Sequence, residues 1–166
     1  LIVGLFDVLS LPDLKKYYRL ALDKKGRLIM KGISEESSKH KICKVVRKTM
    51  LTKGRLQIGL HDGRSIIHTD KINVGDSVVI DFSSNKIVEL LPLEPESVIF
   101  LTSGKHAGDV GTLKELKGKE AMYELDKKEI ETSRNYVFVI GHKKSKKVST
   151  PENAVNFLLG ENEKEQ

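Results

Sequence analysis

Residues 98–116 read VIFLTSGKHAGDVGTLKEL, and this stretch decides the fold. An apolar strand enters a loop that carries Gly104, Gly108 and Gly111, and a second, alternating strand leaves it. Glycine permits the positive φ of a tight turn and lets backbone amides approach a phosphate with no Cβ in between. The stretch therefore predicts two strands joined by a glycine loop, although an ordinary β-turn would have a similar pattern.

The rest of the chain has the same β character, because short alternating or β-branched runs are bounded by turn residues. Three hairpins are predicted, with strands at 17–22 and 27–30, at 56–60 and 64–69, and at 77–82 and 86–91. Further strands are expected at 97–102, 109–115, 121–125 and 135–140, and Ser34 is expected to cap a helical turn. The pattern predicts a mainly β fold of two consecutive small β-barrels.

Pro92 and Pro95 mark the clearest break in the chain, since two prolines in four residues continue neither a ladder nor a helix. We place a domain boundary there, with a first barrel over 1–94 and a second over 95–142. Residues 143–166 are expected to form a basic linker and a short C-terminal helix. Thr150 as N-cap and Pro151 at the first helical position predict that helix over 151–159.

Charge is distributed unevenly along the 166 residues, whose net charge is 29 − 23 = +6. Residues 1–55 carry 14 basic and 5 acidic side chains, whereas residues 56–166 carry 15 and 18. A basic half is typical of a protein that binds a polyanion, because each neutralised phosphate releases counterions. A solvated lysine-rich surface is the alternative interpretation.

The basic side chains fall into two groups. The segment 39–55 contains no acid in 17 positions, and its candidate phosphate contacts are Lys39, Lys41, Lys44, Arg47, Lys48, Lys53 and Arg55. The second group surrounds the first hairpin and comprises Lys15, Lys16, Arg19, Lys24, Lys25 and Arg27. Because Trp is absent and other aromatics are few, the sequence favours recognition of RNA backbone and shape over base stacking.

Several classes of function are excluded. Cys43 is the only cysteine, lies in an apolar strand, and is expected to be a buried structural thiol in a reducing compartment. The five histidines lack metal-ligand spacing, and no nucleotide-binding or hydrolase motif occurs, so no metal, cofactor, catalytic residue or enzymatic activity is predicted. The longest apolar run has five residues, 136–140, which is too short to span a membrane.

The glycine loop at 98–116 resembles the KOW motif of ribosomal proteins and transcription elongation factors. Other blocks extend the resemblance in a fixed order: GLFDVL at 4–9, YR at 18–19, KGR at 25–27, HKICKV at 40–45, HDGRSI at 61–66, VGDS at 74–77 and YVFVIG at 136–141. Together they are similar to the small-subunit ribosomal protein family of archaea and eukaryotes called S-four-e.

The resemblance implies a central barrel, an SH3-like KOW barrel and a preceding helical RNA-binding domain that this chain lacks, in line with its non-Met start. It implies a non-catalytic structural constituent of the small ribosomal subunit, cytoplasmic and monomeric outside the ribosome, with ribosomal RNA and neighbouring ribosomal proteins as partners. The predicted RNA-binding set is completed by Arg64, Gly104, Lys105, His106, Gly108 and Gly111.

Two other functions are compatible with parts of the pattern. Residues 103–106 resemble the loop of the translation factor whose lysine becomes hypusine, but that factor places this barrel first and an OB-fold after it. A transcription-elongation KOW module that binds polymerase is the other, and the basic first half, which a protein partner would not require, counts against it.

Overall fold

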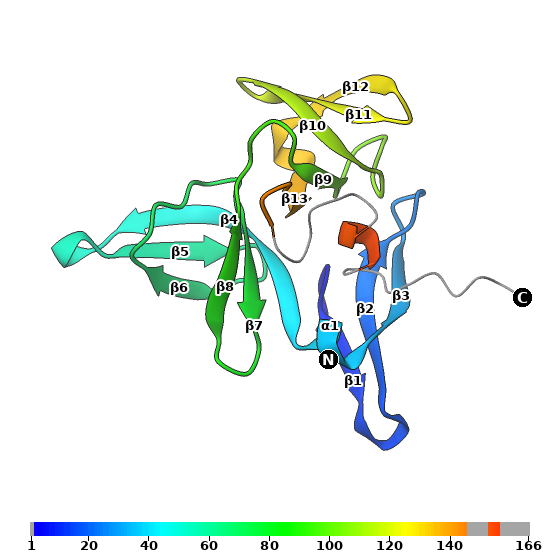
Figure 1. Ribbon diagram of the computed structural model, residues 1–166, viewed down its shortest axis with the longest axis vertical. Coiled ribbons are helices and arrows are strands. Elements are labelled where there is room, and N and C mark those ends of the chain that lie inside the picture. Colours follow the sequence, from blue (N-terminus) through cyan, green and yellow to red (C-terminus); the bar gives the residue numbers. More distant parts are fainter. Residues whose placement is uncertain (1, 146–152, 157–166) are drawn as a thin grey trace, which may run out of the picture.

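Three antiparallel β-sheets make up the computed structural model of the chain, which describes residues 2–145 and 153–156 (Figure 1). The first sheet has the order β1-β2-β3, the second β6-β5-β4-β7-β8 and the third β12-β11-β10-β9-β13. All neighbouring strands in the three sheets are antiparallel. The mainly β fold is confirmed.

The first sheet contains β1 (Val8–Leu11), β2 (Lys16–Leu22) and β3 (Leu28–Ile33), with a 3-10 turn η1 (Pro12–Leu14) between β1 and β2. Asp23 organises the β2–β3 turn, because its Oδ1 accepts hydrogen bonds from the backbone N–H groups of Lys25 and Arg27 at 2.8 Å each. Gly26 has a φ of +73° there. Helix α1 (Glu35–Ser38) follows, and the Ser34 hydroxyl accepts the N–H of Ser37, as predicted.

The second sheet is curled around β4 (His40–Met50), which is long enough to pair with two strands in succession. Its first half pairs with β7 (Ser77–Asp81) and its second half with β5 (Leu56–Leu60), with a bulge between Val45 and Arg47. The edges are β6 (Ser65–His68) and β8 (Lys86–Leu91), and η2 (Thr52–Gly54) joins β4 to β5. One core lies within this sheet and includes Cys43, Ile58, Ile72, Val78 and Ile80.

The third sheet contains β9 (Val98–Leu101), β10 (Val110–Lys117), β11 (Glu120–Leu125), β12 (Lys128–Ser133) and β13 (Val137–Gly141), with η3 (Arg134–Tyr136) before the last strand. The glycine loop of the sequence joins β9 to β10. It is closed by a 2.7 Å hydrogen bond from the N–H of Gly108 to the carbonyl of Leu101. The strand-loop-strand prediction for 98–116 is therefore confirmed.

A second core is shared by all three sheets. The ring of Phe6 packs edge-on against Phe100 and Phe138, with centroid distances of 5.3 and 5.0 Å. Ala21 of the first sheet and Ile42 and Val79 of the second belong to the same buried cluster. The segment 92–97 connects β8 to β9, but the core crosses this connection, and the division into two domains there stays a prediction.

The three predicted hairpins correspond to β2–β3, β5–β6 and β7–β8 and are confirmed. The predictions did not include β1 and β12, which are short or rich in charge. Of the predicted C-terminal helix, residues 153–156 are helical, and the rest of 151–159 lies outside the described residues. No helix within the described part of the chain is long and apolar enough to cross a membrane.

Candidate nucleic-acid interface

The β2–β3 turn and the β9–β10 loop, far apart in sequence, lie against each other (Figure 1). A Cβ built on Gly26 would be 3.3 Å from the Cβ of Ala107, and one built on Gly108 would be 2.1 Å from the carbonyl oxygen of Asp23. Both glycines have positive φ, +73° and +90°. The two segments can approach this closely because neither glycine carries a side chain.

An open cavity of about 330 Å³ lies between the turn and the loop. Three lysines line it: Lys24 and Lys25 from the turn and Lys105 from the loop. Gly26, Thr102, Ser103, Gly104 and Ala107 complete the lining. None of these eight residues is acidic, so the charged side chains that line the cavity are all cationic, which suits an anion.

The two acids next to this cavity, Asp23 and Asp109, contact other groups of this chain. Asp23 Oδ2 lies 2.9 Å from Nε of Arg27, and backbone N–H groups together with this guanidinium hold the pKa of Asp23 below its usual range. Asp109 Oδ2 accepts a 3.3 Å hydrogen bond from the Tyr123 hydroxyl and lies 3.5 Å from Nδ1 of His106. Burial and the neighbouring Asp109 raise the pKa of Tyr123 to about 12. Asp109 therefore braces the base of the loop.

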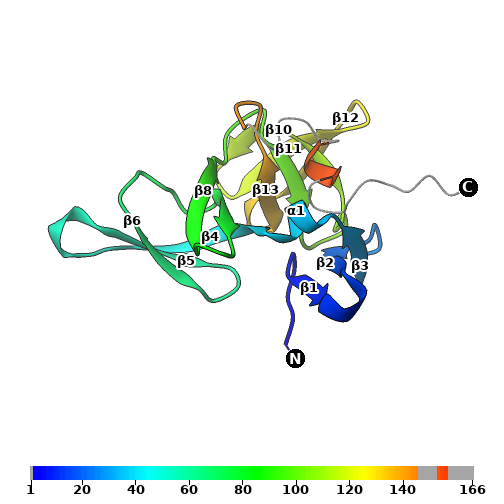
Figure 2. The ribbon, with the colours of Figure 1, turned by 60° about the horizontal axis from the view of Figure 1, so that its bottom comes forward.

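A second exposed basic group lies along the β4–β5 hairpin, from the strand position opposite Gly59 to the outer end. This hairpin projects from the side of the molecule in both ribbon views (Figure 2). The group consists of Arg47, Lys48, Lys53 and Arg55, all exposed. Lys53 and Gly54 have φ values of +62° and +69° and form the tip. We call these four side chains the hairpin-end cations.

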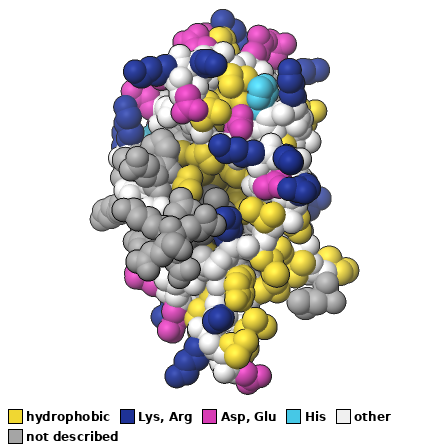
Figure 3. Space-filling view, turned by 90° about the vertical axis from the view of Figure 1, so that its right-hand side faces the viewer, with side chains coloured by type: hydrophobic (Ala, Val, Ile, Leu, Met, Phe, Trp, Pro, Cys, Tyr) yellow, Lys and Arg dark blue, Asp and Glu magenta, His cyan; other side chains and the backbone are white. Residues whose placement is uncertain are grey.

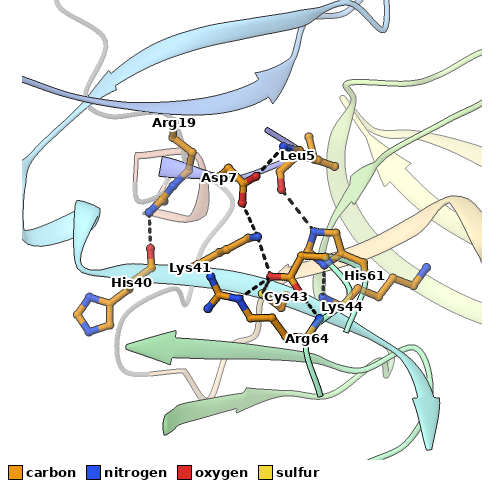
Figure 4. Close-up of polar contacts among 11 residues, drawn as sticks. Leu5, Asp7, Arg19, His40, Lys41, Cys43, Lys44, His61 and Arg64 are labelled. Atoms are coloured by element: carbon orange, nitrogen blue, oxygen red, sulfur yellow. Dashed lines mark hydrogen bonds and ion pairs between the residues drawn. The ribbon is translucent and has the colours of Figure 1, made fainter. Parts of the chain in front are cut away.

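Two of the predicted RNA contacts are in the interior instead. Arg19 is fully buried, and its guanidinium donates to the carbonyls of Ser37 and His40 at 2.7 and 2.6 Å, while burial lowers its pKa to about 10. Lys41 is 1% exposed, and its Nζ lies 2.6 Å from Asp7 Oδ1 and 2.9 Å from Asp62 Oδ2 (Figure 4). Neither side chain can reach an RNA phosphate from this position, so RNA contact by Arg19 and Lys41 is not supported.

The Asp7–Lys41–Asp62 ion pairs tie the start of the chain to β4 and to the β5–β6 turn. Burial alone would raise the pKa values of both carboxyls. The hydrogen bond and charge of Lys41, together with the backbone N–H of Gly4 at Asp7 and of Arg64 at Asp62, outweigh burial, so both pKa values lie below the usual range. Burial would lower the pKa of Lys41, and the two carboxylates reverse this and raise it. All three groups are therefore held in their charged forms at neutral pH.

His61 and Lys44 lie beside these ion pairs (Figure 4). Nδ1 of His61 accepts the backbone N–H of Lys44 at 3.1 Å, which leaves Nε2 to donate to the Leu5 carbonyl at 3.4 Å. Burial lowers the pKa of His61, so the ring is neutral at pH 7. Nζ of Lys44 donates to the Asn135 carbonyl at 3.0 Å, so this predicted RNA contact links β4 to η3, the turn before β13.

Two of the predicted glycines also face the protein itself, and one of them, Gly111, lies in β10, where it pairs with Ile99, and not in the loop. Gly108 faces the Asp23 backbone, and a Cβ on Gly111 would be 2.7 Å from both the Glu124 carbonyl oxygen and the Tyr123 ring. Both glycines allow a close approach, but the group that approaches each of them is part of this chain. Direct RNA contact by Gly108 and Gly111 is therefore not supported.

The remaining predicted residues lie at the surface in separate places. Lys15 and Lys16 are exposed at the opposite end of β2 from Lys24 and Lys25. Lys39 is exposed after α1, 3.8 Å from Glu35. Arg64 lies 3.4 Å from Asp62 and above the Phe82 ring at 5.5 Å. The structure thus brings together Lys24, Lys25, Gly104 and Lys105 around the cavity, with Arg27 and His106 adjacent to it.

Sequence reasoning missed Gly26, Thr102, Ser103 and Ala107 as parts of the cavity lining. Their position next to predicted residues was the available signal, but nothing local in the sequence pairs the turn with the loop. It also missed Tyr136, whose ring would be 3.0 Å from a Cβ on Gly104 and so supports the loop from outside the cavity.

A face of exposed apolar side chains is visible from another side of the molecule (Figure 3). In that view hydrophobic side chains form a band over its lower part, and Lys and Arg side chains lie around the band. The first sheet and its turns contribute exposed Leu11, Leu14, Leu28 and Met30 to the apolar surface of the protein.

Comparison with known proteins places these features in a family. The family model described as Ribosomal family S4e matches residues 14–87. The small ribosomal subunit protein eS4 of Methanothermobacter thermautotrophicus is 37% identical over 150 residues, covering 86% of this chain and 62% of that protein. The eS4 protein of Archaeoglobus fulgidus is 34% identical over 151 residues, covering 87% and 63%. The chain therefore spans somewhat less than two thirds of these relatives.

A solved structure supports the same assignment over most of the chain. The crystal structure of the 30S ribosomal protein S4e from Thermoplasma acidophilum is 30% identical in sequence and aligns with a TM-score of 0.76. The alignment covers 86% of this chain and 74% of that one. On the sequence blocks, the fold and these comparisons, the chain belongs to the ribosomal protein S4e family.

Proposed function

We propose that this protein is a non-catalytic structural constituent of the small ribosomal subunit that binds ribosomal RNA through exposed basic side chains and the KOW loop, its β9–β10 loop. It acts in the cytoplasm as part of the ribosome. Membership of the S4e family and the names of the relatives support the ribosomal role. The exposed apolar side chains of the first sheet offer contact surface for neighbouring ribosomal proteins.

The hairpin-end cations carry the RNA part of the proposal. No Asp or Glu occurs between residues 37 and 61, so no acid from within this hairpin neutralises Arg47, Lys48, Lys53 or Arg55. A projecting, acid-free hairpin can enter a groove of folded RNA and place several cations near phosphates at once. An ordinary solvated surface mixes the two signs of charge.

The proposed mechanism is electrostatic docking. Each phosphate that a lysine or arginine neutralises releases condensed counterions, which favours binding and makes it dependent on salt. Contacts of this kind position a protein on folded RNA without reading base identity. The scarcity of exposed aromatic rings agrees with recognition of backbone and shape.

A salt titration of binding to small-subunit ribosomal RNA tests the proposal. Five or more phosphate contacts give a slope of log affinity against log salt of about −4. A double variant K53A/R55A should make that slope shallower by about 2, because two contacts are lost. The matched control K127A/K128A removes two cations from the β11–β12 turn and should leave the slope nearly unchanged. A wild-type slope near zero would contradict the electrostatic mechanism.

Intact-mass measurement of the protein from its native source addresses the hypusine-type alternative. The ribosomal proposal expects an unmodified Lys105 and co-sedimentation with small subunits in high-salt gradients. A covalent addition on Lys105 would instead favour the translation-factor alternative.

A further inference from the structure

We propose that the cavity between the β2–β3 turn and the β9–β10 loop binds a phosphate of an RNA backbone, and that this phosphate bridges the two segments. The inference rests on the proposed RNA-binding function and adds to it a defined subsite. It also assigns a role to the contact between the first hairpin and the KOW loop.

The cationic groups of the cavity come from both walls. The turn supplies Lys24 and Lys25, and the loop supplies Lys105. Ser103 and Gly104 add a hydroxyl and exposed backbone to the loop side. A phosphodiester has two non-bridging oxygens that share one negative charge, and it can accept hydrogen bonds from both walls, whereas a single lysine wall could position it from one side only.

The two walls are already fixed in relation to each other. The Gly108 backbone packs on the Asp23 carbonyl, and Gly26 packs on Ala107. The Asp23 carboxylate holds the turn by accepting the N–H groups of Lys25 and Arg27. Because this geometry exists before RNA arrives, little ordering of the backbone is needed on binding.

The size and charge of the cavity agree with this ligand. Its volume of about 330 Å³ exceeds that of a water molecule many times, and its open form lets one phosphate of a continuous strand enter. Three ammonium groups around one acid-free cavity repel each other, and an anion removes that repulsion. A bound phosphate therefore favours the docked turn and loop, and by linkage the docked state favours binding.

The test uses the full chain, small-subunit ribosomal RNA as the probe, and the variants K25A, K105A and K25A/K105A, with K128A as the matched control. Each single variant should lose about fivefold in affinity near 0.15 M salt, the value of one phosphate contact. If both lysines hold the same phosphate, the double variant should lose less than the product of the two single losses. K128A should bind like the wild type.

Hydrogen exchange of backbone amides is a second measurement, and a simple loss of charge would not change its result in the turn. RNA should protect the amides of residues 23–27 and 102–109 together. In K105A, protection should fall in the turn as well as in the loop, although the substitution lies only in the loop.

The outcomes separate the subsite from the broader function. The bridging phosphate would be overturned, and the proposed function left intact, by either of two results with salt-dependent RNA binding. In one, K25A and K105A bind RNA as tightly as K128A; in the other, the loss of affinity in K25A/K105A equals the product of the two single losses. Absence of salt-dependent RNA binding by the wild type would overturn both the bridging phosphate and the proposed function. Joint protection of both segments with non-multiplicative losses would support the bridge.

Discussion

The α-carbon of Gly108 faces the backbone of Asp23 so closely that a Cβ on it would lie 2.1 Å from the Asp23 carbonyl oxygen. That oxygen is not free to move, because it accepts the N–H of Gly26 at 2.9 Å and so closes the β2–β3 turn. A glycine in the KOW loop is therefore required by the first hairpin of the same chain.

The variant G108A should lose more than about 3 kcal/mol of unfolding free energy, because a left-handed conformation alone costs about 1–2 kcal/mol and a backbone collision is added. Gly118 is the matched control, because its φ is +59° and a Cβ added there would meet nothing within 4 Å. G118A should lose about 1–2 kcal/mol. Equal losses in urea unfolding would show that the turn and the loop separate easily.

Lys41 should be among the most sensitive charged residues of the chain. The variant K41M removes the cation between Asp7 and Asp62 and leaves two acids without it, so we expect a loss of about 3 kcal/mol. K39M is the matched control, since Lys39 is exposed and its pair with Glu35 spans 3.8 Å. That variant should change stability by less than about 1 kcal/mol. Chemical denaturation of both proteins measures the difference.

Stability should fall in two steps as the pH is lowered. His61 has a lowered pKa in the fold, so below the ordinary histidine pKa of about 6.5 the unfolded chain takes up a proton that the folded chain does not. Asp7 and Asp62 also have lowered pKa values, and their contribution is lost as the pH falls below about 4. Unfolding free energies from pH 8 to pH 3 should show both decreases.

The variant H61Q isolates the first of these steps. Glutamine can accept and donate hydrogen bonds but does not titrate, so the decrease that begins near pH 6.5 should disappear while the one at lower pH remains. H68Q is the control for the loss of a histidine as such, because His68 lies on the edge strand β6, beside Asp70 and away from the contacts of His61. Persistence of the first step in H61Q would assign it to another group.

Cys43 should be unreactive toward thiol reagents in the folded protein. It is fully buried, its thiol lies 3.6 Å from Asp62 Oδ2, and burial with the nearby carboxylate raises its pKa to about 12. The thiolate is the reactive form. Modification by an aromatic disulfide at pH 8 should follow the rate of opening, and fast modification under native conditions would contradict the buried position.

Local chemistry was readable from the sequence where a turn or an alternation decides the structure. Asp23 with Gly26 predicts the first turn, and Ser34 predicts the start of α1, because those effects act within four residues. The positive φ of Gly104 and Gly108 follows from the same kind of reasoning. These signals identified the strand pattern and the loop of the candidate site.

The sequence did not predict which basic side chains are buried and which are exposed, because burial of each depends on residues distant in sequence. Lys41 and Lys48 look alike in the basic segment, yet only Lys41 meets Asp7 and Asp62 and becomes buried. Arg19 enters the interior because the carbonyls of Ser37 and His40 are available there. The cavity likewise needs the long-range packing of the first hairpin on the loop, which no local pattern specifies.

The insertion of Phe6 between Phe100 and Phe138 has a consequence for the order of folding. During synthesis, hairpins such as β2–β3 can form as soon as they leave the ribosome, because their contacts are local. Phe6 can contact both aromatic partners only after residue 138 has emerged, which is after almost all of the described chain has been made. The ring of Phe6 therefore stays exposed while the first sheet forms. Because contacts of such large sequence separation form slowly, closure of the shared core is the slow step of folding.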